Sequence, residues 1–181
     1  MNTNRPRLLD AQLIHDALME VANSLKPDGP QQTLLLVGGA VLALEGLRDM
    51  TEDIDSISLF RADMSSTIAE VANKLNLHSK WLNNAARAFA PEAIDHSSCV
   101  VVLEHPQLRV LAISKRQLFL MKIDAARERD IQDLMLLWSH TGFQHVDEVL
   151  REYELAYPHA QRDEFLGAWI QQIIDRAEGV L

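Results

Sequence analysis

The sequence lacks the features that mark secreted and membrane-spanning proteins. Its single cysteine, Cys99, excludes an internal disulfide and a multi-cysteine metal site, so a cytoplasmic location is expected. Its longest apolar runs are about six residues, whereas a membrane-spanning helix needs roughly 18–20. No apolar signal segment follows the basic residues at the N-terminus. We therefore expect no secretion and no membrane partner.

Basic residues are also scarce. The 181 residues include 17 Lys and Arg against 26 Asp and Glu, a formal net charge of -9. This balance argues against a protein that coats nucleic acid or binds anionic membranes, because both need a basic surface. Residues 104–129 are an exception, with more basic than acidic side chains, and this segment suits a small polyanionic ligand.

Hydrophobic periodicity predicts an α+β (mixed α/β) fold, in which a small mixed β-sheet is flanked by helices and followed by a helical C-terminal part. We expect residues 1–113 to form the α/β core and residues 114–181 the helical part, packed on it as one compact unit. Residues 1–9 should be a loose arm. Predicted strands are 33–37, 52–60, 99–103 and 108–113, the last two forming a hairpin. We expect Asp10 to cap the first helix through its side chain. Predicted helices are 10–25, 40–47, 63–77, 81–89, 118–126, 131–138, 146–157 and 160–177.

Two glycines follow the first predicted strand. Gly38 and Gly39 stand between a buried strand and an apolar helix. Glycine allows close backbone approach, and the first N–H groups of a helix are free to bind an anion. This arrangement can hold a phosphate, although a Gly-Gly pair in this position is often only a tight turn.

Two aspartates open the second predicted strand, in the sequence Thr51-Glu52-Asp53-Ile54-Asp55. Residues i and i+2 of a strand face the same side, so the two carboxylates should project together. Their mutual repulsion favours a bound cation, and Mg²⁺ accepts one or two carboxylates together with substrate phosphates. The simpler alternative is a solvated strand end.

Together these motifs look like the nucleotidyltransferase fold of the polymerase-β type. The downstream stretch resembles the AbiEii-like and related nucleotidyltransferases of bacterial toxin–antitoxin and abortive-infection modules. In that group a helix after the sheet carries a lysine, followed by an arginine-rich segment that contains aspartates. The corresponding residues here are Lys122 and the stretch 126–134, and the resemblance spans roughly residues 33–137.

The resemblance implies an enzyme that uses Mg²⁺ and takes a nucleoside triphosphate as substrate. Gly38, Gly39 and Thr51 would contact its phosphates, and Asp53 and Asp55 would hold the metal. The acceptor would be tRNA or a protein, and a cognate toxin or antitoxin protein is the expected partner. The resemblance also implies that Lys122 contacts the triphosphate and that Arg127 or Arg129 assists in this contact. Asp130 or Asp133 would correspond to an acidic residue that the family carries late in its sequence and that positions the lysine or the acceptor. Alternatively, these arginines and aspartates form an ion-pair network at helical spacing.

One residue that the resemblance predicts, a third carboxylate, is not clearly indicated by the sequence. Active members of the wider fold usually add a third carboxylate on a later strand, and Glu104 is the candidate here. Because His105 and Pro106 follow it directly, Glu104 can equally be a hairpin residue. The strand 108–113 contains no acidic residue. A second hypothesis follows, in which the chain is a catalytically inactive binding or regulatory protein.

Overall fold

The computed structural model describes residues 7–161 and 163–180, which fall into two compact units. The first unit combines the residues up to Ala88 with Cys99–Ile113, and the second combines Phe89–Ser98 with the residues from Ser114 onward. Residues 89–98 thus belong to the second unit, although the sequence suggested that they lie in the first. The described residues contain seven α-helices and one mixed sheet of five strands, which confirms the predicted α+β class.

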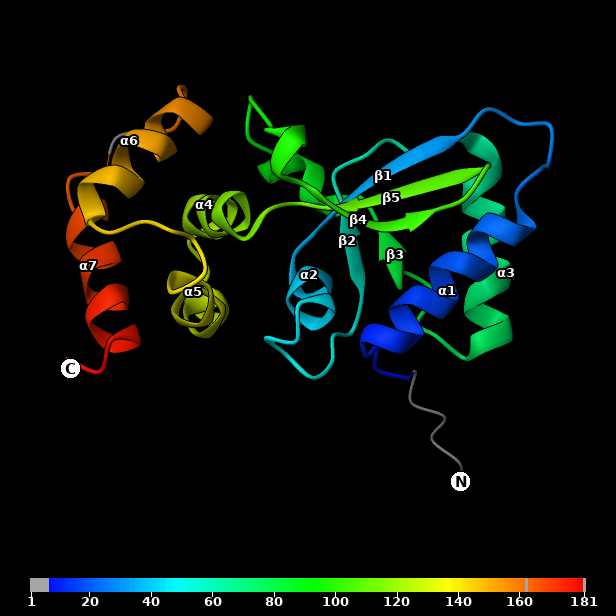
Figure 1. Cartoon of the computed structure of the whole chain (residues 1–181), viewed down its shortest axis with the longest axis horizontal. Helices are drawn as coiled ribbons and strands as arrows, with labels where there is room; N and C mark the ends of the chain where they lie inside the picture. The colour runs from blue at the N-terminus through cyan, green and yellow to red at the C-terminus, as the bar shows by residue number, and fades with distance from the viewer. Residues whose placement is uncertain (1–6, 162, 181) are drawn as a thin grey trace. The chain divides into compact units, whose positions relative to one another are not determined.

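The first unit is built on the sheet, in the order β3-β2-β1-β5-β4 (Figure 1). Central β1 pairs in parallel with β5 and antiparallel with β2, while β4 and β5 form the predicted hairpin. Residues 34–37 of β1 are all buried, as expected for a strand covered on both faces. The strands are β1 (Gln32–Val37), β2 (Ile54–Ser56), β3 (Leu82–Asn83), β4 (Val100–Glu104) and β5 (Leu108–Ala112).

Three helices accompany this sheet: α1 (Ala11–Ser24), α2 (Gly39–Leu44) and α3 (Ala62–Leu75). The predicted cap of α1 is confirmed, because the Asp10 carboxylate accepts a hydrogen bond from the Leu13 N–H at 2.8 Å. Helices α1 and α3 lie side by side (Figure 1), joined through their buried apolar stripes. Asn76 ends α3 in the left-handed conformation.

The second strand is much shorter than the predicted range 52–60. The strand covers only Ile54–Ser56, of which Asp55 and Ser56 pair with β1. Beyond it the Ile57 N–H donates to the Leu35 carbonyl at 3.1 Å, and serine side chains supply the other bonds. The Ser56 hydroxyl donates to the Leu35 carbonyl at 3.0 Å, and the Ser58 hydroxyl accepts from the Leu35 N–H at 2.9 Å. The alternation of apolar and polar residues in the sequence cannot show where serine side chains take over hydrogen bonds from the strand backbone.

The helix predicted over residues 81–89 is wrong. Leu82 and Asn83 instead form β3, which pairs in parallel with β2, and a 3₁₀ turn occupies Ala85–Phe89. Trp81 is fully buried and its indole N–H donates to the Ile68 carbonyl of α3 at 3.0 Å. This tertiary anchor draws the chain into the sheet edge and overrides the local helical pattern.

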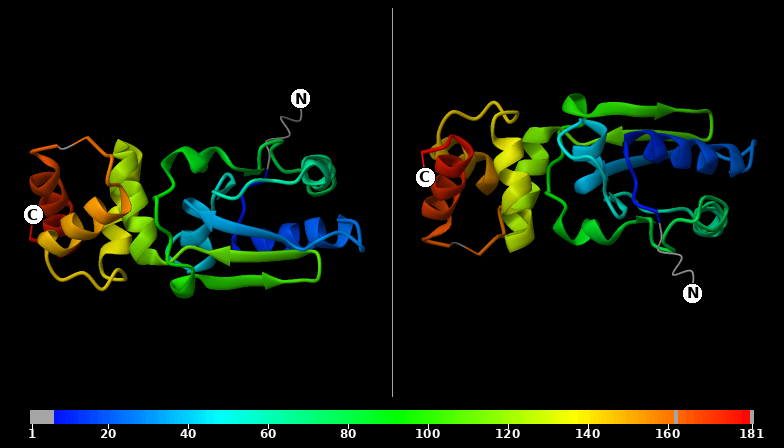
Figure 2. Two further views of the ribbon diagram at one scale, coloured as in Figure 1. Left: turned by 90° about the horizontal axis from the view of Figure 1, so that it is seen from above. Right: turned by 90° about the horizontal axis from the view of Figure 1, so that it is seen from below.

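The second unit consists mainly of helices (Figure 2, yellow-green to red). They are α4 (Lys115–Ala125), α5 (Ile131–Trp138), α6 (Val146–Ala156) and α7 (Leu166–Ala177). The aromatic ring of Phe119 lies 6.0 Å from that of Trp138 and 6.2 Å from that of Phe143, centroid to centroid. Helix α7 begins later than the predicted residue 160, after a turn in which the Asp163 carboxylate accepts from the Phe165 N–H. Within the described residues, no helix combines the length and apolarity needed to cross a bilayer.

The segment before α1 is held in place, in contrast to the loose arm predicted for residues 1–9. Residues 1–6 of that prediction lie outside the described residues. Leu9 is fully buried, and its N–H and carbonyl both bond to the backbone of Thr51 at 2.8 Å. The Arg7 N–H donates to the Asn76 carbonyl at 3.1 Å. Residues 7–9 therefore fasten the loop that carries Thr51.

We expect Leu9→Ala to lower the free energy of unfolding by about 2–5 kcal/mol, the usual cost of truncating a buried leucine. Leu8→Ala is the matched control, because Leu8 is half exposed and should change stability by less than about 0.5 kcal/mol. Urea unfolding followed by circular dichroism measures both. Equal stability of the two variants would show that Leu9 does not anchor the segment.

Candidate functional site

The predicted glycine and aspartate motifs meet at one end of the sheet in the first unit. Strand β1 runs directly into Gly38, and the antiparallel register places Asp55 opposite Val37, the last residue of β1. Asp53 immediately precedes β2 at the same end. The order of strands thus brings together residues separated by a helix and a loop in the sequence.

The backbone of Gly38 and Gly39 approaches neighbouring side chains too closely to leave room for a side chain of its own. A Cβ atom on Gly38 would lie 2.9 Å from Asp55 Oδ2, and Gly38 also has a positive φ of 72°. A Cβ atom on Gly39 would lie 2.7 Å from Thr51 Oγ1. Both distances are far below the roughly 3.5–4.0 Å of an ordinary carbon contact. The two glycines therefore set the Asp55 carboxylate and the Thr51 hydroxyl directly against the main chain.

The carboxylates of Asp53 and Asp55 occupy alternate positions along the start of β2 and are both half-buried, while Ile54 between them is fully buried. The Asn83 side-chain amide donates to Asp53 Oδ2 at 3.4 Å from the neighbouring strand β3. The described residues contain no group of three or more His, Cys, Asp or Glu side chains that could hold a metal ion. Two carboxylates still fit Mg²⁺, which completes its shell with water and substrate phosphates.

Arg48 is a site residue that sequence reasoning missed. Its Nη1 atom lies 2.9 Å from the position of a Cβ on Gly39, which is also close to the Thr51 hydroxyl. The only signal in the sequence was its place as a cation between the glycines and the aspartates. Asn83 was missed because residues 81–89 were assigned to a helix.

Glu104 does not join this group. It ends β4 and pairs in register with Arg109 at the start of β5, whereas Asp55 aligns with the other end of the sheet through Val37, Leu36 and Ala112. The Arg109 guanidinium contacts the Glu104 carboxylate at 3.0 Å, and the Gln31 amide donates to it at 3.1 Å. The structure thus gives Glu104 exposed partners, one from the hairpin and one before β1, and does not bring it to the aspartates.

In the second unit, Lys122 forms a buried triad with Asp130 and Asp133. Its ammonium lies 2.6 Å from Asp130 Oδ1 and 2.7 Å from Asp133 Oδ2. All three side chains are buried, and they come from α4, the 3₁₀ turn Glu128–Asp130 and α5. The triad ties consecutive helices together, since removing one partner from a buried ion pair leaves an uncompensated charge.

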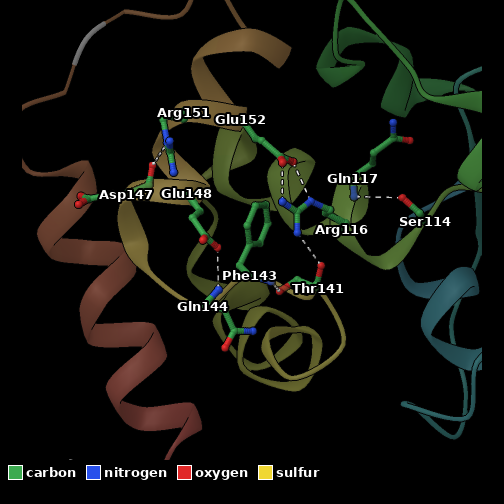
Figure 3. Close-up of polar contacts among 10 residues, drawn as sticks. All are labelled: Ser114, Arg116, Gln117, Thr141, Phe143, Gln144, Asp147, Glu148, Arg151 and Glu152. Atoms are coloured by element: carbon green, nitrogen blue, oxygen red, sulfur yellow. Dashed lines mark hydrogen bonds and ion pairs between the residues drawn. The ribbon is translucent and has the colours of Figure 1, made fainter.

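Most other cations of residues 104–129 also have partners. The Arg116 guanidinium forms a two-point pair with the Glu152 carboxylate (Figure 3), with Nε to Oε2 at 2.8 Å, and this pairing raises the pKa of Arg116. Arg127 lies over the Phe89 ring at 4.8 Å, while Arg129 is exposed. Much of the positive charge of residues 104–129 is therefore neutralised by ion pairs within the protein.

Burial raises the pKa values of Asp124 on α4 and Tyr153 on α6, whose side chains are in contact. Desolvation raises the pKa of Asp124 above its ordinary value, against the smaller opposing effect of the hydrogen bond from Tyr153. Desolvation, followed by the charge of Asp124, raises the pKa of Tyr153 to about 12. The Tyr153 hydroxyl is therefore protonated at neutral pH and donates to Asp124 Oδ1 at 3.1 Å.

Comparison with known families decides the wider identity. A family model described as a nucleotidyltransferase of unknown function (DUF6036) matches residues 14–173. The chain belongs to this family. The match includes the glycines, the aspartates and the Lys122 triad, and it confirms the nucleotidyltransferase resemblance of the sequence. No curated protein and no solved structure matches the chain.

For this DUF6036 protein we expect Gly39→Ala to cost about 1–3 kcal/mol of stability, because the new methyl group would overlap Thr51 Oγ1. Thr51→Ala removes that oxygen, so Gly39→Ala should cost less in a Thr51→Ala background. Chemical denaturation of the wild type, both single variants and the double variant measures the coupling. Additive effects would show that the two residues are not in contact.

We expect Lys122→Met to destabilise this nucleotidyltransferase-family chain by about 3–5 kcal/mol, since it leaves two buried carboxylates without a cation. Adding Asp130→Asn and Asp133→Asn should restore much of the loss. Arg129→Gln, at an exposed position, is the control and should change stability by less than about 0.5 kcal/mol. Thermal and urea unfolding test the series, and a neutral Lys122→Met would contradict the buried triad.

Proposed function

We propose that the protein is a Mg²⁺-dependent nucleotidyltransferase. A hydroxyl of the acceptor would attack the α-phosphorus of a nucleoside triphosphate, form a new phosphate ester and release pyrophosphate, with the hydroxyl proton passing to solvent. The observation that carries this proposal is the contact geometry at Gly38, whose backbone abuts the Asp55 carboxylate with no room for a side chain. Family membership supports the same reaction class.

Each residue of this group has a role in the proposal. Asp53 and Asp55 would hold the metal ion, which offsets charge on the transferring group. The glycines would let the triphosphate approach the main chain. Arg48 would supply the positive charge beside them, because its guanidinium already lies against Gly39. Thr51 would orient the loop, since its hydroxyl donates to the Asp53 carbonyl at 3.1 Å.

We assign Lys122 a positioning role instead of the triphosphate contact that the resemblance implies. Its ammonium already binds two carboxylates, and releasing it toward a phosphate would leave Asp130 and Asp133 buried together. Arg127 and Arg129 are exposed and remain the candidates of this segment for contact with a polyanion. The resemblance to toxin–antitoxin modules supports tRNA or a protein as acceptor, with growth inhibition as the consequence.

A second candidate function is binding without catalysis, as an antitoxin or another regulatory partner. It is favoured by the position of Glu104, whose register partner Arg109 lies at the other end of the sheet from Asp53 and Asp55. Calorimetric titration with a nucleoside triphosphate and Mg²⁺ distinguishes a protein that binds no nucleotide from one that binds it, with or without catalysis. Heat release that depends on Mg²⁺ would exclude a scaffold that binds no nucleotide.

The proposed reaction predicts transfer of an α-³²P label, but not of a γ-³²P label, from at least one nucleoside triphosphate to tRNA or to lysate protein. Asp55→Asn should lower the rate by at least about 100-fold, because losing even a supporting partner of a metal ligand costs 10–100-fold. Asp53→Asn should have a similar effect. The measurement is label incorporation with and without Mg²⁺.

Two matched variants serve as controls. Glu52→Gln makes the same chemical change at the exposed position beside Asp53 and should retain activity. Glu104→Gln should also retain activity, because Glu104 belongs to the hairpin end of the sheet. No transfer by folded wild type with any of the four triphosphates would overturn the catalytic proposal. Full activity of Asp55→Asn would overturn the assignment of the metal site.

A further inference from the structure

Asn83 lies beside both aspartates of the candidate site, although the proposed reaction gives it no role. Strand β3 lies next to β2 at one edge of the sheet (Figure 1), and the parallel register pairs Asn83 with Asp55. Side chains in register on neighbouring strands project from the same face of a sheet. The Asn83 amide also donates to Asp53 Oδ2 at 3.4 Å. One neutral side chain is therefore in register with one carboxylate that we assign to the metal ion and bonded to the other.

The partners of Asn83 fix the direction of its amide. Its Oδ1 atom accepts a hydrogen bond from the Ala85 N–H at 3.0 Å, at the start of the 3₁₀ turn. Its Nδ2 atom donates to the Lys80 carbonyl at 3.4 Å as well as to Asp53. Because the Ala85 N–H can only donate, it holds the amide oxygen and so turns the amide nitrogen toward Asp53. Asn83 thus presents a hydrogen-bond donor, and no charge, to that carboxylate.

A hydrogen bond to one carboxylate oxygen affects how the carboxylate binds a metal ion. An oxygen that accepts such a bond is a weaker metal ligand, so coordination through both oxygens is disfavoured, and the bond also orients the carboxylate. Mg²⁺ requires a near-ideal octahedral shell, into which a carboxylate fits through one oxygen. Ca²⁺ has a larger and more flexible shell and also takes carboxylates through both oxygens. The bond from Asn83 to Asp53 therefore disfavours Ca²⁺ more than Mg²⁺.

We propose that Asn83 is a positioning residue, which holds Asp53 for coordination through one oxygen and thereby favours Mg²⁺ over Ca²⁺ at the candidate site. The inference rests on the proposed function in taking Asp53 and Asp55 as metal ligands. It does not depend on the triphosphate or on the acceptor, because binding of the metal ion alone can be measured. Absence of nucleotidyl transfer would therefore leave this inference standing, and an unaltered ion preference in an Asn83 variant would leave the proposed reaction standing.

The test measures metal binding to the full-length protein without nucleotide. Mn²⁺ is the probe, because its electron paramagnetic resonance signal reports the free ion, and Mg²⁺ or Ca²⁺ is added to displace it from the protein. Asn83→Ser removes the amide donor, while the serine hydroxyl can still accept from the Ala85 N–H, as serine does in such turns. We expect this variant to bind Mg²⁺ about 10-fold more weakly and Ca²⁺ equally or more tightly than the wild type.

Asn84→Ser makes the same change one residue further along the chain and should leave the ratio of the two affinities unchanged. Asn83→Thr is a second variant with the same acceptor and a higher strand propensity, for use if Asn83→Ser is unstable in urea. Unchanged affinities, or an equal loss of both, would give Asn83 at most a structural role and overturn the inference, as would the same shift of the ratio in Asn84→Ser. Absence of Mn²⁺ binding by the folded wild type would overturn it together with the metal assignment of Asp53 and Asp55.

Discussion

The first unit depends on one steric constraint, the absence of side chains at Gly38 and Gly39. The chain can place a carboxylate and a hydroxyl against its own backbone only because no Cβ atom stands between them. This contact joins the end of β1 to the start of β2 and to the loop around Thr51. Leu9 holds that loop from outside through two backbone hydrogen bonds, so the arrangement is supported at residues distant in sequence.

In the second unit, the main constraint is that charged side chains are buried among its helices. Lys122 is buried because two carboxylates from the next turn and helix neutralise it. Such a cluster stabilises the fold only while it is complete, because each member would be costly alone. The same residue types that the resemblance assigns to ligand contact therefore also hold α4 and α5 together.

Local patterns predicted the elements whose type and position follow from the residues of the segment itself. The Asp10 cap, the strand before the glycines, the hairpin and the helices of the second unit follow from spacing and turn residues. The pattern failed where distant contacts decide the structure. Trp81 pulls its segment into a strand by bonding to α3, and Ser56 and Ser58 end β2 early by bonding to β1.

In the candidate site, too, some residues could be identified from local sequence and others only from contacts between distant segments. Gly38, Gly39, Asp53 and Asp55 could be selected from sequence because each motif is short and self-contained. Glu104 could not be located without the strand order, which determines the end of the sheet that each residue reaches. Arg48 and the partners of Lys122 likewise depend on contacts between elements, which spacing alone does not define.

The second unit is assembled from two stretches of chain that are not adjacent in sequence. Residues 89–98 leave the sheet after β3 and return before β4, so the polypeptide passes between the units three times. A gene segment that encodes only the residues from Ser114 onward would lack part of that unit. A single contiguous segment of chain therefore cannot carry the complete helical unit without also carrying the hairpin segment Cys99–Ile113 of the first unit.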